Sequence, residues 1–111
     1  MTNVLVFGYS DNPERYSYMA FELLKDYGHK AVAFNPRTDD FKSLAKSFDT
    51  ITLYVNPTIG EKFSDGLLKI KTKRVIFNPG TENPVLEKKF QELGVEIVIG
   101  CTLVMLKTNQ Y

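Results

Sequence analysis

The sequence predicts an α/β domain in three layers, built on a doubly wound parallel sheet of about five strands. Short apolar runs alternate with segments of helical periodicity through short loops, which is typical of parallel strands covered on both faces. The apolar runs are also nearly continuous, whereas a sheet with one face in water would alternate apolar and polar residues. The length of 111 residues fits one domain, expected over residues 1–111.

The first strand, helix and second strand are expected between residues 4 and 34. The apolar run 4–7 (VLVF) ends at Gly8 and leads into a polar loop. Residues 17–27 carry apolar side chains at helical spacing, and Gly28 supplies the left-handed position that ends many helices. The run 30–34 (KAVAF) then has the composition of a second strand.

The middle of the chain is expected to hold two helices around a third strand. Residues 38–48 are polar, with three apolar side chains spaced for one short helix. Residues 50–55 (TITLYV) are rich in β-branched and aromatic residues, which indicates a strand. Residues 58–70 carry an apolar helical face, which Gly60 and Gly66 weaken.

The last third contains the strongest helix signal. Residues 74–77 (RVIF) predict a fourth strand. Asn83 is a good N-cap for a helix over residues 84–93, which begins with a proline and is followed by a glycine. Residues 95–99 (VEIVI) predict a fifth strand, and residues 101–106 are apolar enough for a packed tail or a sixth strand.

Composition and charge exclude several classes of protein. The 14 basic and 13 acidic residues give a net charge of +1, which argues against bulk attraction to nucleic acid or a membrane surface. No apolar run is long enough to span a membrane, and the N-terminus lacks a signal-peptide pattern, so we expect a cytoplasmic protein. One cysteine, Cys101, excludes an internal disulfide, and the single histidine, His29, argues against a structural zinc site.

Every proline in the chain follows an asparagine. The pairs are Asn12-Pro13, Asn35-Pro36, Asn56-Pro57, Asn78-Pro79 and Asn83-Pro84. Four pairs follow the ends of the first four predicted strands, and parallel strands bind ligands beyond their carboxyl ends. Asn-Pro also initiates turns without any ligand. The pairs therefore predict either simple turns or rigid turns whose amides face a bound molecule.

The loop after the first strand limits the kind of ligand. It lacks the G-x-G-x-x-G pattern of dinucleotide-binding loops and the G-x-x-x-x-G-K-[ST] pattern of nucleotide hydrolases. Gly8 still allows a ligand to approach the backbone, and the loop amides before the helix are expected to dock an anion. Ser10 and Ser17 add hydroxyls, while Arg15 could reach a phosphate or remain a solvated side chain.

A cation follows the second strand where an NAD site would have a carboxylate. Arg37 comes directly after Asn35-Pro36, and Asp39 and Asp40 lie further on. A phosphorylated ribose favours a cation at this position, which indicates NADP or coenzyme A. The alternative is an arginine in a solvated turn beside two aspartates.

The chain resembles the small CoA-binding domain family, whose Rossmann-like members are similar to the N-terminal CoA-binding domain of the succinyl-CoA synthetase α subunit. The resemblance covers essentially the whole chain. It rests on the segments VFGYSDNPERYSYMAFELLKDYGH, AVAFNPR, LYVNP, RVIFNPGTENP and GVEIVIGCTLVML.

The resemblance implies coenzyme A, or an acyl-CoA, along the carboxyl edge of the sheet. Around the pyrophosphate it implies Gly8, Tyr9, Ser10, Asn12, Pro13, Arg15 and Ser17. By the adenosine phosphate and the adenine it implies Asn35, Pro36, Arg37, Asn56 and Pro57. The far wall would consist of Asn78, Pro79, Gly80, Thr81, Glu82 and Asn83. Many members have alanine at the position of Tyr9, so here a phenol is expected to crowd or stack in the cleft.

No nucleophile and base stand at a spacing that compels catalysis. The first hypothesis is therefore a CoA-binding module without chemistry of its own, acting as a carrier, sensor or partner subunit. The alternatives are an NADP-dependent reductase or other nucleotide-cofactor enzyme with the same cleft, and an interaction domain whose ligand site has decayed.

The single histidine, the single cysteine and the apolar segment near the C-terminus each support one further expectation. His29 is expected in a surface turn at the edge opposite the ligand. Cys101 is either a small buried residue or a thiol able to form a mixed disulfide with CoA. The apolar segment 103–106 (LVML) leaves a homodimer open.

Overall fold

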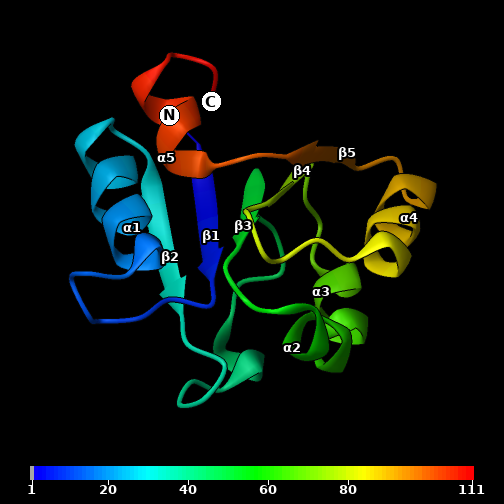
Figure 1. Ribbon diagram of the computed structural model, residues 1–111. Coiled ribbons are helices and arrows are strands. Elements are labelled where there is room, and N and C mark those ends of the chain that lie inside the picture. Colours follow the sequence, from blue (N-terminus) through cyan, green and yellow to red (C-terminus); the bar gives the residue numbers. More distant parts are fainter. Residues whose placement is uncertain (1) are drawn as a thin grey trace.

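The structure is a computed structural model that describes residues 2–111, and its centre is a five-stranded parallel sheet (Figure 1). The strands are β1 (Asn3–Phe7), β2 (Lys30–Phe34), β3 (Thr50–Leu53), β4 (Arg74–Phe77) and β5 (Glu96–Ile99). Their order is β2-β1-β3-β4-β5, and the last residues of all five are in register. All five strand ends therefore open onto one edge, and the predicted fold class is confirmed.

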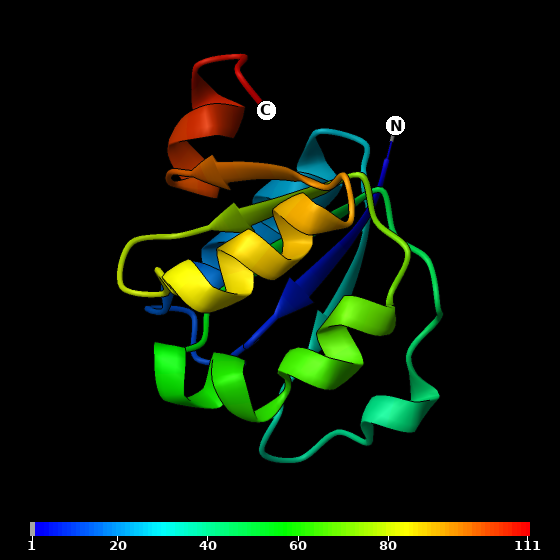
Figure 2. The same cartoon turned by 90° about the vertical axis from the view of Figure 1, so that its right-hand side faces the viewer.

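Helices cover both faces of the sheet (Figures 1 and 2). On one face lie α1 (Tyr16–Asp26) and α5 (Thr102–Lys107), which contact each other. On the other lie α2 (Pro57–Lys62), α3 (Ser64–Lys69) and α4 (Pro84–Glu92). β1 alternates between these layers: Val4 and Val6 pack under α1 and α5, whereas Leu5 and Phe7 belong to the larger core on the other face.

The expected helix over residues 38–48 is wrong, because this segment is mostly loop. Only the short 3₁₀ helix η1 (Phe41–Ser43) forms, capped by the Asp40 carboxylate, which accepts from the Lys42 N–H. The Phe41 ring lies so close to Gly66 that a Cβ there would be 2.8 Å from it. The ring also packs against Phe7, Phe34 and Phe63, and these long-range contacts outweigh the weak helical pattern of a polar segment.

The expected helix over residues 58–70 is divided into α2 and α3 at Phe63. The Phe63 ring contacts Phe7 at 5.5 Å and stacks on Phe41 at 6.0 Å, so the chain turns there to bury this side chain. The end of the chain forms no sixth strand. It is a packed tail, because α5 buries Leu103 and Leu106.

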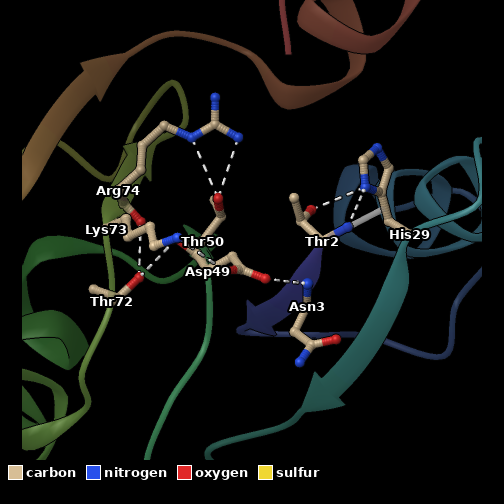
Figure 3. Close-up of polar contacts among 8 residues, drawn as sticks. All are labelled: Thr2, Asn3, His29, Asp49, Thr50, Thr72, Lys73 and Arg74. Carbon is tan, nitrogen blue, oxygen red and sulfur yellow. Dashed lines mark hydrogen bonds and ion pairs between the residues drawn. The ribbon is translucent and has the colours of Figure 1, made fainter.

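Side-chain hydrogen bonds stabilise the amino edge of the sheet, which is opposite the edge formed by the carboxyl ends of the strands (Figure 3). The Asp49 carboxylate accepts from the Asn3 N–H at 2.8 Å, and the Arg74 guanidinium donates to the Thr50 hydroxyl at 3.2 Å. His29 lies at this edge, as expected, but it is half-buried: Nδ1 is 2.9 Å from the Thr2 hydroxyl. The Tyr111 ring packs against both His29 and Arg74. Its centroid lies 4.9 Å from the centroid of the His29 ring and 4.4 Å from the guanidinium carbon of Arg74.

No helix within residues 2–111 is long and apolar enough to cross a membrane.

Candidate functional site

A cleft of about 820 Å³ lies at the carboxyl edge of the sheet. Four loops form it, those that follow β1, β2, β3 and β4. The chain leaves β1 toward α1 on one face and leaves β3 toward α2 on the other, so the loops diverge at the point where the winding direction changes. Ligands of open parallel sheets bind at such a point, and the volume is in the range of small-molecule sites.

Most of the predicted site residues line this cleft. They are Gly8, Tyr9, Ser10, Asn12, Arg15, Ser17, Asn35, Pro36, Arg37, Asn56, Pro79, Gly80 and Thr81. Five predicted residues lie outside the lining: Pro13, Pro57, Asn78, Glu82 and Asn83. The structure adds Glu14, Tyr16, Tyr54, Val55 and Ile59, which sequence reasoning missed although they are neighbours of predicted residues.

Gly8 brings the first loop against the end of β3. Its φ is +102°, and a Cβ would lie 2.8 Å from the Tyr54 carbonyl carbon. The N–H groups of Gly8 and Tyr9 both donate to the Phe34 carbonyl at 2.9 Å, and the Ser10 N–H donates to the Ser17 hydroxyl at 3.0 Å. These three N–H groups are therefore already bonded within the protein, whereas the sequence predicts free amides in this loop.

The free donors lie instead at the first turn of α1. Its N-cap, Arg15, makes no capping hydrogen bond, and no acidic side chain lies in the first turn. The N–H groups of Tyr16, Ser17 and Tyr18 have no acceptor among residues 2–111. Because the helix dipole adds partial positive charge here, this end of α1 is suited to an anion. The N-terminus of α4, by contrast, is closed by the Asn83 side chain, which accepts from the Leu86 N–H.

The loop after β2 presents a cation to the cleft. The Asp39 carboxylate accepts from the Asn35 N–H at 2.8 Å, and Asp40 caps η1, so both aspartates are engaged in their own loop. Arg37 is exposed, lines the cleft and forms no ion pair within the described residues. A guanidinium rather than a carboxylate therefore lines the cleft at this position.

Four of the asparagines that precede proline accept hydrogen bonds through their Oδ1 atoms from N–H groups two or three residues further on. These atoms accept from the N–H groups of Glu14, Arg37, Ile59 and Leu86, at 2.9–3.2 Å. Asn12 and Asn35 thus form simple turns, whereas Asn56 and Asn83 are the N-caps of α2 and α4. The NH₂ groups of Asn12, Asn35 and Asn56 remain at the cleft with no acceptor in the part of the chain described.

Tyr9 and Tyr54 line the cleft, and Cys101 lies near Tyr54. Tyr9 packs against Phe21 with ring centroids 5.1 Å apart, and burial raises the pKa of its phenol. Burial also raises the pKa of Tyr54 to about 12. Cys101 is half-buried at the N-cap of α5 and is not part of the lining. Residues 2–111 contain no cluster of three or more His, Cys, Asp or Glu side chains that could hold a metal.

Fold and site together define an α/β protein of the Rossmann-like class, with an uncapped helix N-terminus and two arginines that form no ion pair within residues 2–111 at the carboxyl edge of its sheet. Within this class the chain belongs to the CoA binding domain family, whose model matches residues 2–107.

Solved structures with the same fold include one at 39% sequence identity, the crystal structure of an uncharacterized protein. It superposes with a TM-score of 0.90 and covers 100% of this chain and 98% of the other. A protein of Thermus thermophilus (19% identity, TM-score 0.85, 98% and 90% covered) and a hypothetical protein of Pyrococcus horikoshii OT3 (22%, 0.80, 97% and 82%) share the fold alone. No curated protein matches the chain.

Proposed function

We propose that the protein binds coenzyme A or an acyl-CoA in this cleft and performs no chemistry of its own, as a carrier, a sensor or a partner subunit. The observation that carries the proposal is the open first turn of α1 beside Arg15, with Arg37 on the neighbouring loop. Three free N–H groups and a guanidinium suit the diphosphate, and Arg37 suits the phosphate on the ribose. Membership of the CoA binding domain family supports the same ligand.

An NADP-dependent enzyme is the second candidate, because NADP also carries a phosphate on a ribose. Arg37 alone does not distinguish the two ligands. The first loop favours CoA, since its amides at Gly8, Tyr9 and Ser10 are bonded within the protein and no second glycine lets a dinucleotide approach them.

A panel of ligands tests the proposal. Thermal unfolding is measured with CoA, acetyl-CoA, NADP, NAD and ATP, and affinities are taken by calorimetry. A ligand at one hundred times its dissociation constant stabilises the native state by about 2.7 kcal/mol. For a domain of this size the midpoint should rise by roughly 10 °C. A rise of the unfolding midpoint with NADP, and none with millimolar CoA, would contradict CoA binding and favour the NADP-dependent enzyme.

The same samples test the absence of chemistry. Acetyl-CoA incubated with the protein should release free thiol no faster than in buffer. Turnover that persists through repurification and is lost in Cys101→Ala would instead make Cys101 a nucleophile.

A further inference from the structure

Asn78 was expected among the ligand contacts, but its side chain is 2% exposed and lies beneath the cleft. Its NH₂ group donates to the Thr52 hydroxyl at 2.7 Å and to the Leu53 carbonyl at 2.8 Å. Its Oδ1 accepts from the N–H of Thr102 at 2.9 Å and from the Thr102 hydroxyl at 3.0 Å. The amide therefore uses both its donors and both its acceptor positions inside the protein.

The hydroxyls of Thr52 and Thr102 are 2.7 Å apart and complete a closed ring with Asn78. Since the Thr102 hydroxyl donates to Oδ1 and Thr52 accepts from the Asn78 NH₂, the Thr52 hydroxyl must donate to Thr102. Thr52 and Thr102 are both fully buried. Every hydrogen of the ring then has one acceptor, and such satisfied buried networks hold a single arrangement.

The ring joins three segments that are distant in sequence. Thr52 and Leu53 end β3, directly before the cleft residues 54–56, and Asn78 follows β4, directly before the cleft residues 79–81. The Asn78 carbonyl also accepts from the N–H and the hydroxyl of Thr81, at 3.0 and 2.7 Å. Thr102 is the first residue of α5 and does not line the cleft.

We propose that Asn78 is a positioning residue that fixes the walls after β3 and β4 for the ligand and couples them to the first turn of α5. This inference rests on the proposed binding of CoA. When the loops after β3 and β4 are already fixed before binding, the ligand loses less free energy in ordering them. Because Thr102 is bonded to the same amide as the wall, occupation of the cleft also restrains the start of α5.

Thr102→Val and Thr102→Ser form the matched pair for the test. Valine keeps the shape and the N–H bond but removes the hydroxyl from the ring, whereas serine retains the hydroxyl. At a temperature where all proteins are folded, we expect Thr102→Val to weaken CoA about fivefold or more. Thr102→Ser should bind within about twofold of the unmodified protein. Phe90→Leu, a core change in α4 outside the cleft, controls for lost stability and should leave CoA affinity unchanged.

Amide hydrogen exchange provides a readout that a purely structural role would not move. In the unmodified protein, saturating CoA should slow exchange of the Thr102 N–H, although Thr102 does not line the cleft. In Thr102→Val this slowing should be smaller, because only the N–H bond still links residue 102 to the Asn78 amide. If Thr102→Val fails to fold, Asn78→Asp takes its place, because its carboxylate cannot donate to Thr52 or Leu53.

The outcomes separate the two proposals. If the unmodified protein does not bind CoA, the proposed function and this inference both fail. If it binds CoA and Thr102→Val binds equally well, with the same slowing at residue 102, only the positioning role of Asn78 is overturned.

Discussion

At the scale of single residues, Gly8 shows how a backbone position shapes the cleft. In Gly8→Ala the new Cβ would meet the Tyr54 backbone at 2.8 Å in a conformation with φ of +102°. We expect a loss of roughly 2–4 kcal/mol in the free energy of unfolding, measured by urea denaturation. Gly28→Ala is the control: φ is +86°, but nothing lies within 4 Å of the added atom, so only the backbone cost of about 1 kcal/mol applies. Equal losses in the two variants would contradict the steric role of Gly8.

Arg37 lines the cleft on the loop after β2, and we expect it to distinguish CoA from dephospho-CoA. A guanidinium that pairs with the ribose phosphate contributes charge-assisted hydrogen bonds worth about 1.5–3 kcal/mol each. Arg37→Ala should therefore weaken CoA by about ten- to a hundredfold and leave dephospho-CoA nearly unchanged. Arg15→Ala should weaken both ligands alike, because both carry the diphosphate. Calorimetry measures the affinity of each variant for CoA and for dephospho-CoA. If Arg37→Ala still prefers CoA to the same extent, Arg37 is only a solvated turn residue.

His29 predicts a dependence of stability on pH. Desolvation lowers the pKa of His29 below its ordinary value of 6.5, and the neighbouring Arg74 charge acts in the same direction. Between the lowered pKa and 6.5 the unfolded chain binds more protons than the native protein. Stability should thus be constant above this window and fall as the pH drops through it. Urea denaturation between pH 8 and about pH 5 measures the fall in the free energy of unfolding, because carboxylates begin to titrate below this range. His29→Gln should show a smaller fall.

At the scale of secondary-structure elements, the open end of α1 gives a prediction in which stability and affinity move in opposite directions. A carboxylate in the first turn complements the helix dipole by about 0.3–1 kcal/mol. Tyr16→Glu should therefore raise the unfolding midpoint slightly, because Tyr16 is the first residue of α1 and 70% exposed. The same charge would repel a diphosphate at this helix end, so CoA affinity should fall.

Tyr16→Gln is the neutral control for this experiment. It removes the same ring without adding charge, so it should cost much less affinity than Tyr16→Glu. If the two variants bind CoA equally, the diphosphate does not lie at the N-terminus of α1.

The elements were predictable where a local signal decided them. Asn83 caps α4 and Gly28 adopts a positive φ, so the expected starts and stops of these segments are close to those observed. The failures involve contacts between distant segments. Phe41 packs near Gly66, and Phe63 turns inward toward Phe7, and neither partner is visible in the local periodicity. Helical spacing alone therefore overestimated one helix and merged two others.

At the scale of the whole molecule, the position of the cleft was predictable because parallel strands bring their ends to one edge. The role of each atom was not. Asn56 and Asn78 both precede proline after a strand, yet Asn56 caps α2 at the surface while Asn78 is bonded within the core. The partners of Asn78, Thr52 and Thr102, are 26 and 24 residues away, so only the folded chain reveals them.

The packing of Tyr111 against His29, beside Thr2, also has a practical consequence. These contacts keep both ends of the described chain together at the amino edge of the sheet, whereas the cleft opens at the carboxyl edge. The domain can therefore be tethered to a surface, or inserted into a loop of a reporter protein through both ends, with its cleft still facing solution. In such an insertion, a ligand that makes the domain more rigid would act on the reporter protein through two junctions that lie close together. A genetically encoded indicator requires this geometry.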